Sequence, residues 1–170
     1  MIGIYANAQK DSLMARNTIF IEGLGNGLMY SINFDRHIYK RDNFKISIRG
    51  GAAYIPLSDL PVWSFPVATN FIFGDKHHLE FGCGLTYVYG LNSTYDSNSK
   101  LLISSSIYLA IKLIGYRFQI NKGGLFFSIG LIPILKIIEL NSAYKNTKHF
   151  LKSEFGPTIG LGIGYTIKKK

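Results

Sequence analysis

Hydrolytic chemistry needs a nucleophile, a base and an acid, and one segment of this sequence holds all three. That segment lies near the C-terminus and comprises Lys148, His149, Lys152, Ser153 and Glu154. Its spacing does not define a Ser–His–acid triad, which is recognised by geometry. We therefore expect no catalytic residue, and a lipid-modifying enzyme stays an alternative that substitution of His149 and Ser153 would test.

The remaining histidines and the single cysteine give no pattern of a metal or redox site. His77 and His78 are adjacent, but no second cluster stands at metal-ligand spacing, so we expect a solvated turn. One cysteine, Cys83, excludes an internal disulfide and any CxxC motif. The glycines at 156, 160, 162 and 164 follow a strand pattern with no helix behind it, unlike a phosphate-binding loop. We predict no metal and no cofactor.

Six charged side chains share one face of the predicted strands and form the candidate polar site. They are the acids Glu22, Asp35 and Glu80 and the bases Lys45, Arg49 and Arg117, with His37 and His78 nearby. Three acids facing three bases would pair, because an unpaired buried charge is costly. We predict a network of salt bridges that fills the interior of a barrel. A gated polar path or a small-ligand site is the alternative.

Strands must position these side chains, because the main pattern in the sequence is alternation with period two. It occurs in stretches that begin near Leu28, Phe44, Leu79, Leu125 and Ile159. Short turn signals lie at residues 40–43, 74–77 and 121–124, and longer loops at 57–66, 91–100 and 139–148. A first strand over residues 18–24, turned back at 25–27, completes eight strands. We predict an all-β, antiparallel, up-and-down barrel.

The two faces of these strands decide whether the barrel is soluble or spans a membrane. One face is bulky and apolar; its members include Ile32, Phe34, Ile46, Ile48, Phe81, Leu85, Phe127, Ile129, Leu161 and Ile163. The other face is too poor in charge for a soluble exterior, since the last strand shows only Thr and Gly there. We predict a transmembrane barrel with the apolar face toward lipid. Eight strands leave room inside for side chains only, so we expect no open pore.

Aromatic residues near the strand ends predict two girdles at the membrane interfaces. Those near the long loops are Tyr54, Tyr87 and Tyr89, and those near the short turns are Phe44, Phe73, Tyr116, Phe118 and Tyr165. Trp63 falls in the first long loop, as an interface anchor or a partner contact. Pro133 is expected near the rim, where proline costs no ladder bond. The register that turns Ile114 outward also puts Lys112 on the lipid side.

Composition and charge limit the class and the location. Of the 170 residues, 47% are hydrophobic and 17% are charged, which excludes a disordered chain and fits one domain. Residues 1–8 resemble the end of a signal peptide, because Ala6-Asn7-Ala8 suits signal peptidase. We divide the chain into this segment, a polar leader over 9–17 and a barrel over 18–170. The basic excess behind the net charge of +9 concentrates at the short turns, where we expect contact with anionic phospholipid headgroups or peptidoglycan rather than nucleic acid.

Two stretches carry a family resemblance. Residues 27–36 (GLMYSINFDR), together with 115–119 (GYRFQ) and Gly123-Gly124, resemble small eight-stranded outer-membrane proteins of the OmpX and OmpA transmembrane-domain type. The resemblance covers residues 18–167 and is architectural. It implies a bacterial outer-membrane location with periplasmic termini, and insertion by the outer-membrane assembly machinery. One departure is the end of the sequence, since many such proteins finish on an aromatic residue and this one finishes on three lysines.

These expectations lead to one functional prediction with alternatives. We predict a small integral outer-membrane barrel with a structural or interaction role, whose long extracellular loops form the contact surface. Its expected partners are outer-membrane lipids and lipopolysaccharide, with a larger outer-membrane protein complex as a further candidate. The alternatives are a lipid-modifying enzyme, a soluble periplasmic lipocalin-like binder of an apolar ligand, and a narrow channel.

Overall fold

Eight strands make up most of the part of the chain that the structure describes. The computed structural model describes residues 16–41, 43–56, 61–95, 101–141 and 155–168, without the side chains of 91–95, 101–104, 139, 141 and 155. The strands are β1 (Asn17–Gly23), β2 (Tyr30–Arg41), β3 (Phe44–Ile55), β4 (Val62–Gly74), β5 (His77–Tyr95), β6 (Leu101–Gln119), β7 (Gly124–Asn141) and β8 (Phe155–Thr166). Within these ranges no helix is long and apolar enough to cross a membrane.

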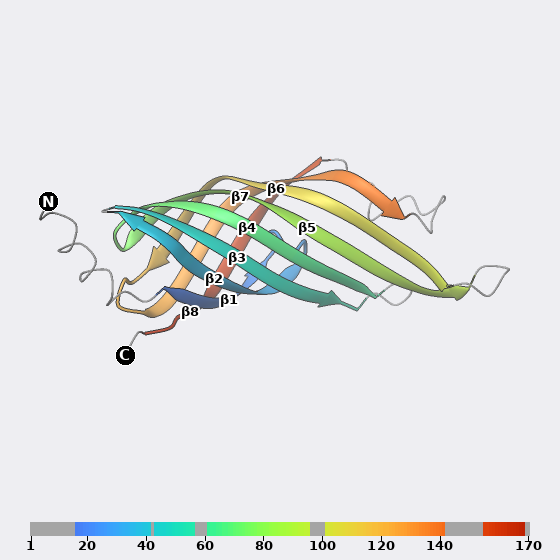
Figure 1. Ribbon diagram of the computed structural model, residues 1–170, viewed down its shortest axis with the longest axis horizontal. Coiled ribbons are helices and arrows are strands. Elements are labelled where there is room, and N and C mark those ends of the chain that lie inside the picture. The colour runs from blue at the N-terminus through green and yellow to red at the C-terminus, as the bar shows by residue number, and fades with distance from the viewer. Residues whose placement is uncertain (1–15, 42, 57–60, 96–100, 142–154, 169–170) are drawn as a thin grey trace, which may run out of the picture.

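The strands form one closed barrel. Each strand pairs antiparallel with the next in the sequence, and β1 pairs with β8 to close the ring. The start of β1 and the end of β8 lie at the same end as the short turns after β2, β4 and β6, and the longer connections lie at the other end (Figure 1). We call these the turn end and the loop end. The predicted all-β, eight-stranded, up-and-down barrel is confirmed, and it fits the general OmpX-like fold.

Alternation along each strand separates two chemically different faces. On β2 every second residue from Ser31 to His37 is buried, while Ile32, Phe34, Arg36 and Ile38 are exposed. The buried faces carry the polar and charged residues together with a smaller set of apolar ones, and the exposed faces carry large apolar residues. Residues that alternate along the sequence therefore face the interior and the exterior in turn once the sheet closes into a barrel.

A bulge in β6 changes the predicted position of Lys112. On β5, Glu80 pairs with Gly115 and Gly82 pairs with Lys112, so Leu113 and Ile114 together face the single residue Phe81. Both Leu113 and Ile114 are exposed. The extra residue reverses the alternation beyond it, so Lys112 points into the barrel. The prediction that Lys112 lies on the lipid side was wrong.

The same bulge explains Pro133, which lies in the middle of β7 and not near the rim. The pairing between β6 and β7 shifts by one residue between Ala110↔Ile134 and Ile114↔Leu131, which brackets Pro133. On the other side Pro133 pairs with Pro157 of β8. Neither proline has an N–H to give to the ladder, and bulges are where sheets tolerate proline.

The first long connection is shorter than predicted. β4 begins at Val62, so Trp63 is a strand residue on the outer face and not a loop residue. Likewise β5 and β6 continue to Tyr95 and from Leu101, into the loop predicted at 91–100. These strands are much longer than the 9–11 residues that cross a bilayer. They extend the barrel wall at the loop end (Figure 1).

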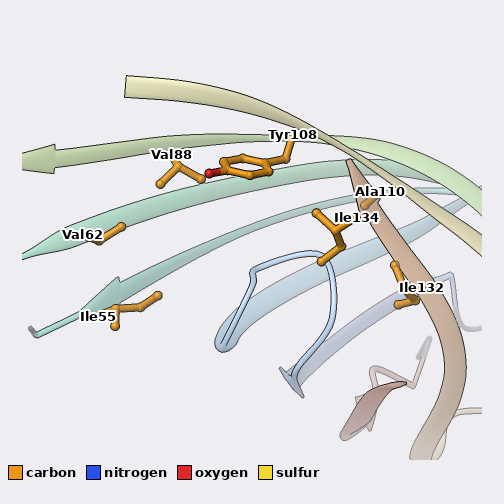
Figure 2. Close-up of a cluster of buried hydrophobic side chains, with 7 residues drawn as sticks. All are labelled: Ile55, Val62, Val88, Tyr108, Ala110, Ile132 and Ile134. Carbon is orange, nitrogen blue, oxygen red and sulfur yellow. The ribbon is translucent and has the colours of Figure 1, made fainter. Parts of the chain in front are cut away.

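A small apolar core fills the loop end of the interior. Figure 2 shows its members, which come from five successive strands: Ile55, Val62, Val88, Tyr108, Ala110, Ile132 and Ile134. All are at most 8% exposed. The turn end of the interior contains the charged residues instead, so the barrel interior has an apolar layer at the loop end and a charged layer at the turn end.

Candidate functional site

The outer wall is the largest chemically uniform surface of the protein. The ten residues predicted to face lipid all lie on it, between inward neighbours on their strands. Eight of them are more than one-third exposed, up to 62% at Ile32, and Ile46 and Phe81 are half-buried. A monomeric soluble protein rarely exposes contiguous apolar area on this scale.

Aromatic rings form a belt on the wall near the loop end. Tyr54, Trp63, Phe65 and Tyr87 follow one another across three strands, with ring centroids 4.8, 6.3 and 6.5 Å apart. The hydroxyl of Tyr30 donates to the backbone carbonyl of Tyr54. We call these four rings the loop-end belt.

A second belt surrounds the wall near the turn end. Phe44 packs against Phe73 at 4.9 Å and against Tyr39 at 6.1 Å. Further round, the His77 ring lies 5.5 Å from Phe118 and its Nδ1 is 2.6 Å from the Tyr116 hydroxyl. We call these rings the turn-end belt. Two belts with an apolar wall between them match the surface of a membrane barrel.

Inside the barrel, Arg117 occupies the centre of the charged layer. Its Nη2 lies 3.1 Å from Oδ1 of Asp35, and its Nη1 lies 3.3 Å from Oε1 of Glu80. All three side chains are at most 2% exposed. Nε donates to Gln119, and the guanidinium lies 4.8 Å from the centre of the Phe126 ring. One cation therefore pairs with two buried carboxylates.

A second ion pair lies beside this centre. Nη1 of Arg49 donates to Oε1 of Glu22 at 2.9 Å, and both residues are 2% exposed. The Arg49 guanidinium also lies 5.5 Å from the centre of the Phe20 ring. The pairing of Glu22 with Arg49 links β1 to β3 across the interior.

The predicted pairing of three acids with three bases needs one correction. All six predicted residues are buried inside, but Lys45 has no carboxylate within 4.0 Å among the described residues. Its Nζ lies 2.7 Å from Nε2 of His78 and donates to Oδ1 of Asn121 at 2.8 Å. Lys112 takes the predicted role instead, since its Nζ lies 3.0 Å from Oε2 of Glu80. The bulge that sets the register of β6 depends on pairing with β5, so the sequence of β6 alone does not show it.

The turn between β1 and β2 enters the interior and separates the two layers. Gly25, Asn26 and Gly27 are buried. The backbone carbonyl of Asn26 accepts a hydrogen bond from Thr86 of β5 at 2.6 Å, and that of Gly27 accepts one from Ser64 of β4 at 3.0 Å. The turn thus crosses the interior of the barrel and is held there by β4 and β5. Sequence reasoning identified the turn but not its inward position.

The conformation of this turn depends on glycine and on Glu22. Leu24 and Leu28 adopt positive φ angles of 54° and 75°, which are uncommon for residues with a side chain. A Cβ at Gly25 would overlap the carboxyl group of Glu22, whose Oε2 accepts a hydrogen bond from the N–H of Asn26 at 3.1 Å. Glu22 therefore holds both the turn and Arg49.

Replacing Glu22 by alanine is expected to lower the free energy of unfolding by about 3 kcal/mol. The change leaves Arg49 buried without its carboxylate and the N–H of Asn26 without its acceptor. Urea unfolding of the folded barrel measures the effect. Glu22→Gln is the intermediate variant, because it keeps one of the two acceptor oxygens and the side-chain volume but loses the charge, and it should fall between wild type and Glu22→Ala. Equal stability of all three proteins would contradict this account.

The candidate catalytic segment and the candidate metal pair differ in what the structure describes of them. Lys148, His149, Lys152, Ser153 and Glu154 lie outside the described residues. Among those that are described, no group of three His, Cys, Asp or Glu side chains could hold a metal ion. Comparison with protein-family models, with curated proteins and with solved structures found no match. The outer wall and the buried charged layer are therefore the features of the described chain that bear on its function.

Proposed function

We propose that this chain is a small integral outer-membrane β-barrel with a closed lumen and a structural or interaction role. The observation that carries the proposal is the inverted polarity of the barrel. Its wall exposes large apolar residues, whereas its interior buries seven charged ones, namely Glu22, Asp35, Glu80, Lys45, Arg49, Lys112 and Arg117. A soluble ligand-binding barrel has the opposite arrangement, with apolar residues inside and polar residues outside.

The distance between the two aromatic belts supports a membrane-spanning wall. Phe44 of the turn-end belt and Tyr54 of the loop-end belt lie on the same strand, β3. Ten residues at about 3.3 Å each, on a strand tilted by about 40°, cover a height of about 25 Å. That height equals the apolar band typical of outer-membrane barrels, about 25 Å.

The interior supports a barrel without a pore. The ion pairs of Arg117 and Arg49 fill the charged layer, the β1–β2 turn crosses above it, and seven apolar side chains fill the layer beyond. These contacts account for the interior residues that form them, without an ion path or a ligand-binding chamber. The proposal includes no catalytic activity. Mass analysis of lipid A tests this point, by comparing cells that carry the wild type with cells that carry a His149→Ala, Ser153→Ala double variant.

The loop end supports a role in contact. β5 continues eight residues past Tyr87 of the loop-end belt, to Tyr95, and pairs there with the start of β6. This hairpin therefore extends beyond the apolar band (Figure 1). In the proposed orientation it faces the cell exterior, where lipopolysaccharide and partner proteins are met.

The mature chain is expected to fractionate with outer membranes and to change its electrophoretic mobility on heating. A membrane barrel resists unfolding by detergent until it is boiled, because its strands form a closed hydrogen-bonded ring. Electrophoresis with and without boiling, after folding into lipid vesicles, measures this. A chain that stays soluble without detergent and shows no mobility shift would refute the proposal and favour the soluble binder.

A further inference from the structure

We propose that Arg36 binds the phosphate of a phospholipid in the periplasmic leaflet. This inference rests on the proposed membrane location and adds a defined lipid site to it. Arg36 lies on β2 and points outward, unlike the buried bases of the interior. A charged residue on a lipid-facing surface is expensive and usually functional.

The surroundings of Arg36 on the wall are apolar along β2 and on the β3 side, and the paired residue on β1 is Asn17. Its neighbours along β2 are Phe34 and Ile38, and the paired residue on β3 is Ile48; these three are 44%, 53% and 46% exposed. Within the described residues its guanidinium has no hydrogen bond and no ion pair. The described part of the chain therefore supplies a cation here and offers it no anion.

The height of Arg36 on the wall brings its guanidinium within reach of lipid headgroups at the turn end. The paired Ile48 lies four residues along β3 from Phe44 of the turn-end belt, which is about 10 Å of height on a tilted strand. An arginine side chain can cover most of that height by directing its guanidinium toward the interface. A phosphodiester there matches the two parallel N–H donors of the guanidinium.

Further cations at the adjacent rim favour an anionic lipid. Arg16 precedes Asn17, which pairs with Arg36, and the carbonyl of Asn17 accepts a hydrogen bond from the N–H of Ile167. That bond places Lys168 at the same corner of the barrel. Arg16, Lys168 and Lys122 are all exposed. The ligand class is thus a phospholipid with a net negative headgroup, such as phosphatidylglycerol, and not a zwitterionic one.

The test compares lipid retention by the folded barrel in native mass spectrometry. Protein is folded in phosphatidylcholine vesicles and then incubated with phosphatidylglycerol. The amount of phosphatidylglycerol that stays bound is compared for wild type, Arg36→Leu and Arg36→Lys. We expect wild type to retain phosphatidylglycerol, and Arg36→Leu to retain about fivefold less. Arg36→Lys should lie between them, because it keeps the charge but not the paired donors. Arg41→Leu, at the turn itself, is the matched control and should retain most of the lipid.

The outcomes separate this site from the proposed function. Arg36→Leu should fold, since leucine suits a lipid-facing position, and the heat-dependent mobility shift verifies this. Equal retention by wild type and Arg36→Leu, or displacement of the lipid by glycerol phosphate in solution, would overturn the site while the barrel in phosphatidylcholine remains intact. Failure of the wild type to fold into any vesicle would instead refute the membrane proposal.

Discussion

Replacing Arg117 by methionine is expected to destabilise the folded barrel by about 3–5 kcal/mol. Arg117 pairs with both Asp35 and Glu80 in the interior, and all three residues are almost fully buried. Methionine fills a similar volume but leaves Asp35 without its cation. Glu80 keeps only Lys112. The cost comes from the uncompensated carboxylates rather than from lost packing.

Urea unfolding in vesicles, followed by fluorescence, measures this effect. Trp63 is the only tryptophan, and it lies in the loop-end belt, so its emission reports transfer from the wall to water. Adding Asp35→Asn to Arg117→Met should recover part of the lost stability, because it removes one unpaired charge. If the single variant unfolds at the wild-type urea concentration, the charged layer does not contribute as described.

Gly164→Ala is expected to prevent normal closure of the barrel, with a loss of about 3 kcal/mol or more. Gly164 pairs with Phe20 across the seam between β8 and β1. A Cβ there would overlap the backbone carbonyl of Ile19 and would lie 2.5 Å from Cα of Phe20. These are main-chain atoms, which cannot move away without separating the two strands.

The chain offers a matched control for this substitution. Gly50 is also in a strand, but a Cβ at that position would have no atom within 4 Å. Gly50→Ala should therefore fold with wild-type yield and mobility. The yield of the heat-modifiable band measures both variants. Equal yields for Gly164→Ala and Gly50→Ala would show that the seam has more room than the structure describes.

The number of strands and their two faces could be predicted because alternation is a local property. Ile32, Phe34 and Leu161 share a side of their strands whatever the rest of the chain does. The direction of each face follows from charge content, which is also visible in the sequence. For this reason the burial of Glu22, Asp35 and Arg117 agrees with the pattern alone.

The features that could not be predicted arise from breaks in that alternation. Leu113 and Ile114 form a bulge only because β5 offers a single residue opposite them, which depends on pairing between two strands. Lys112 therefore faces the interior and not the lipid side that the alternation predicts. The inward turn at Asn26 depends on acceptors and donors from β4 and β5, which are far from it in the sequence. Neither feature has a local signal.

In the proposed membrane location, the two-layered interior has a consequence for the permeability of the bilayer. An ion entering from the turn end meets buried charges, among which Lys45 has no carboxylate partner within the described residues, and beyond them the β1–β2 turn and a layer of hydrocarbon side chains. Crossing that layer would require the ion to shed its hydration. Many copies of such a protein could therefore crowd a bilayer without making it leaky to salts or nutrients.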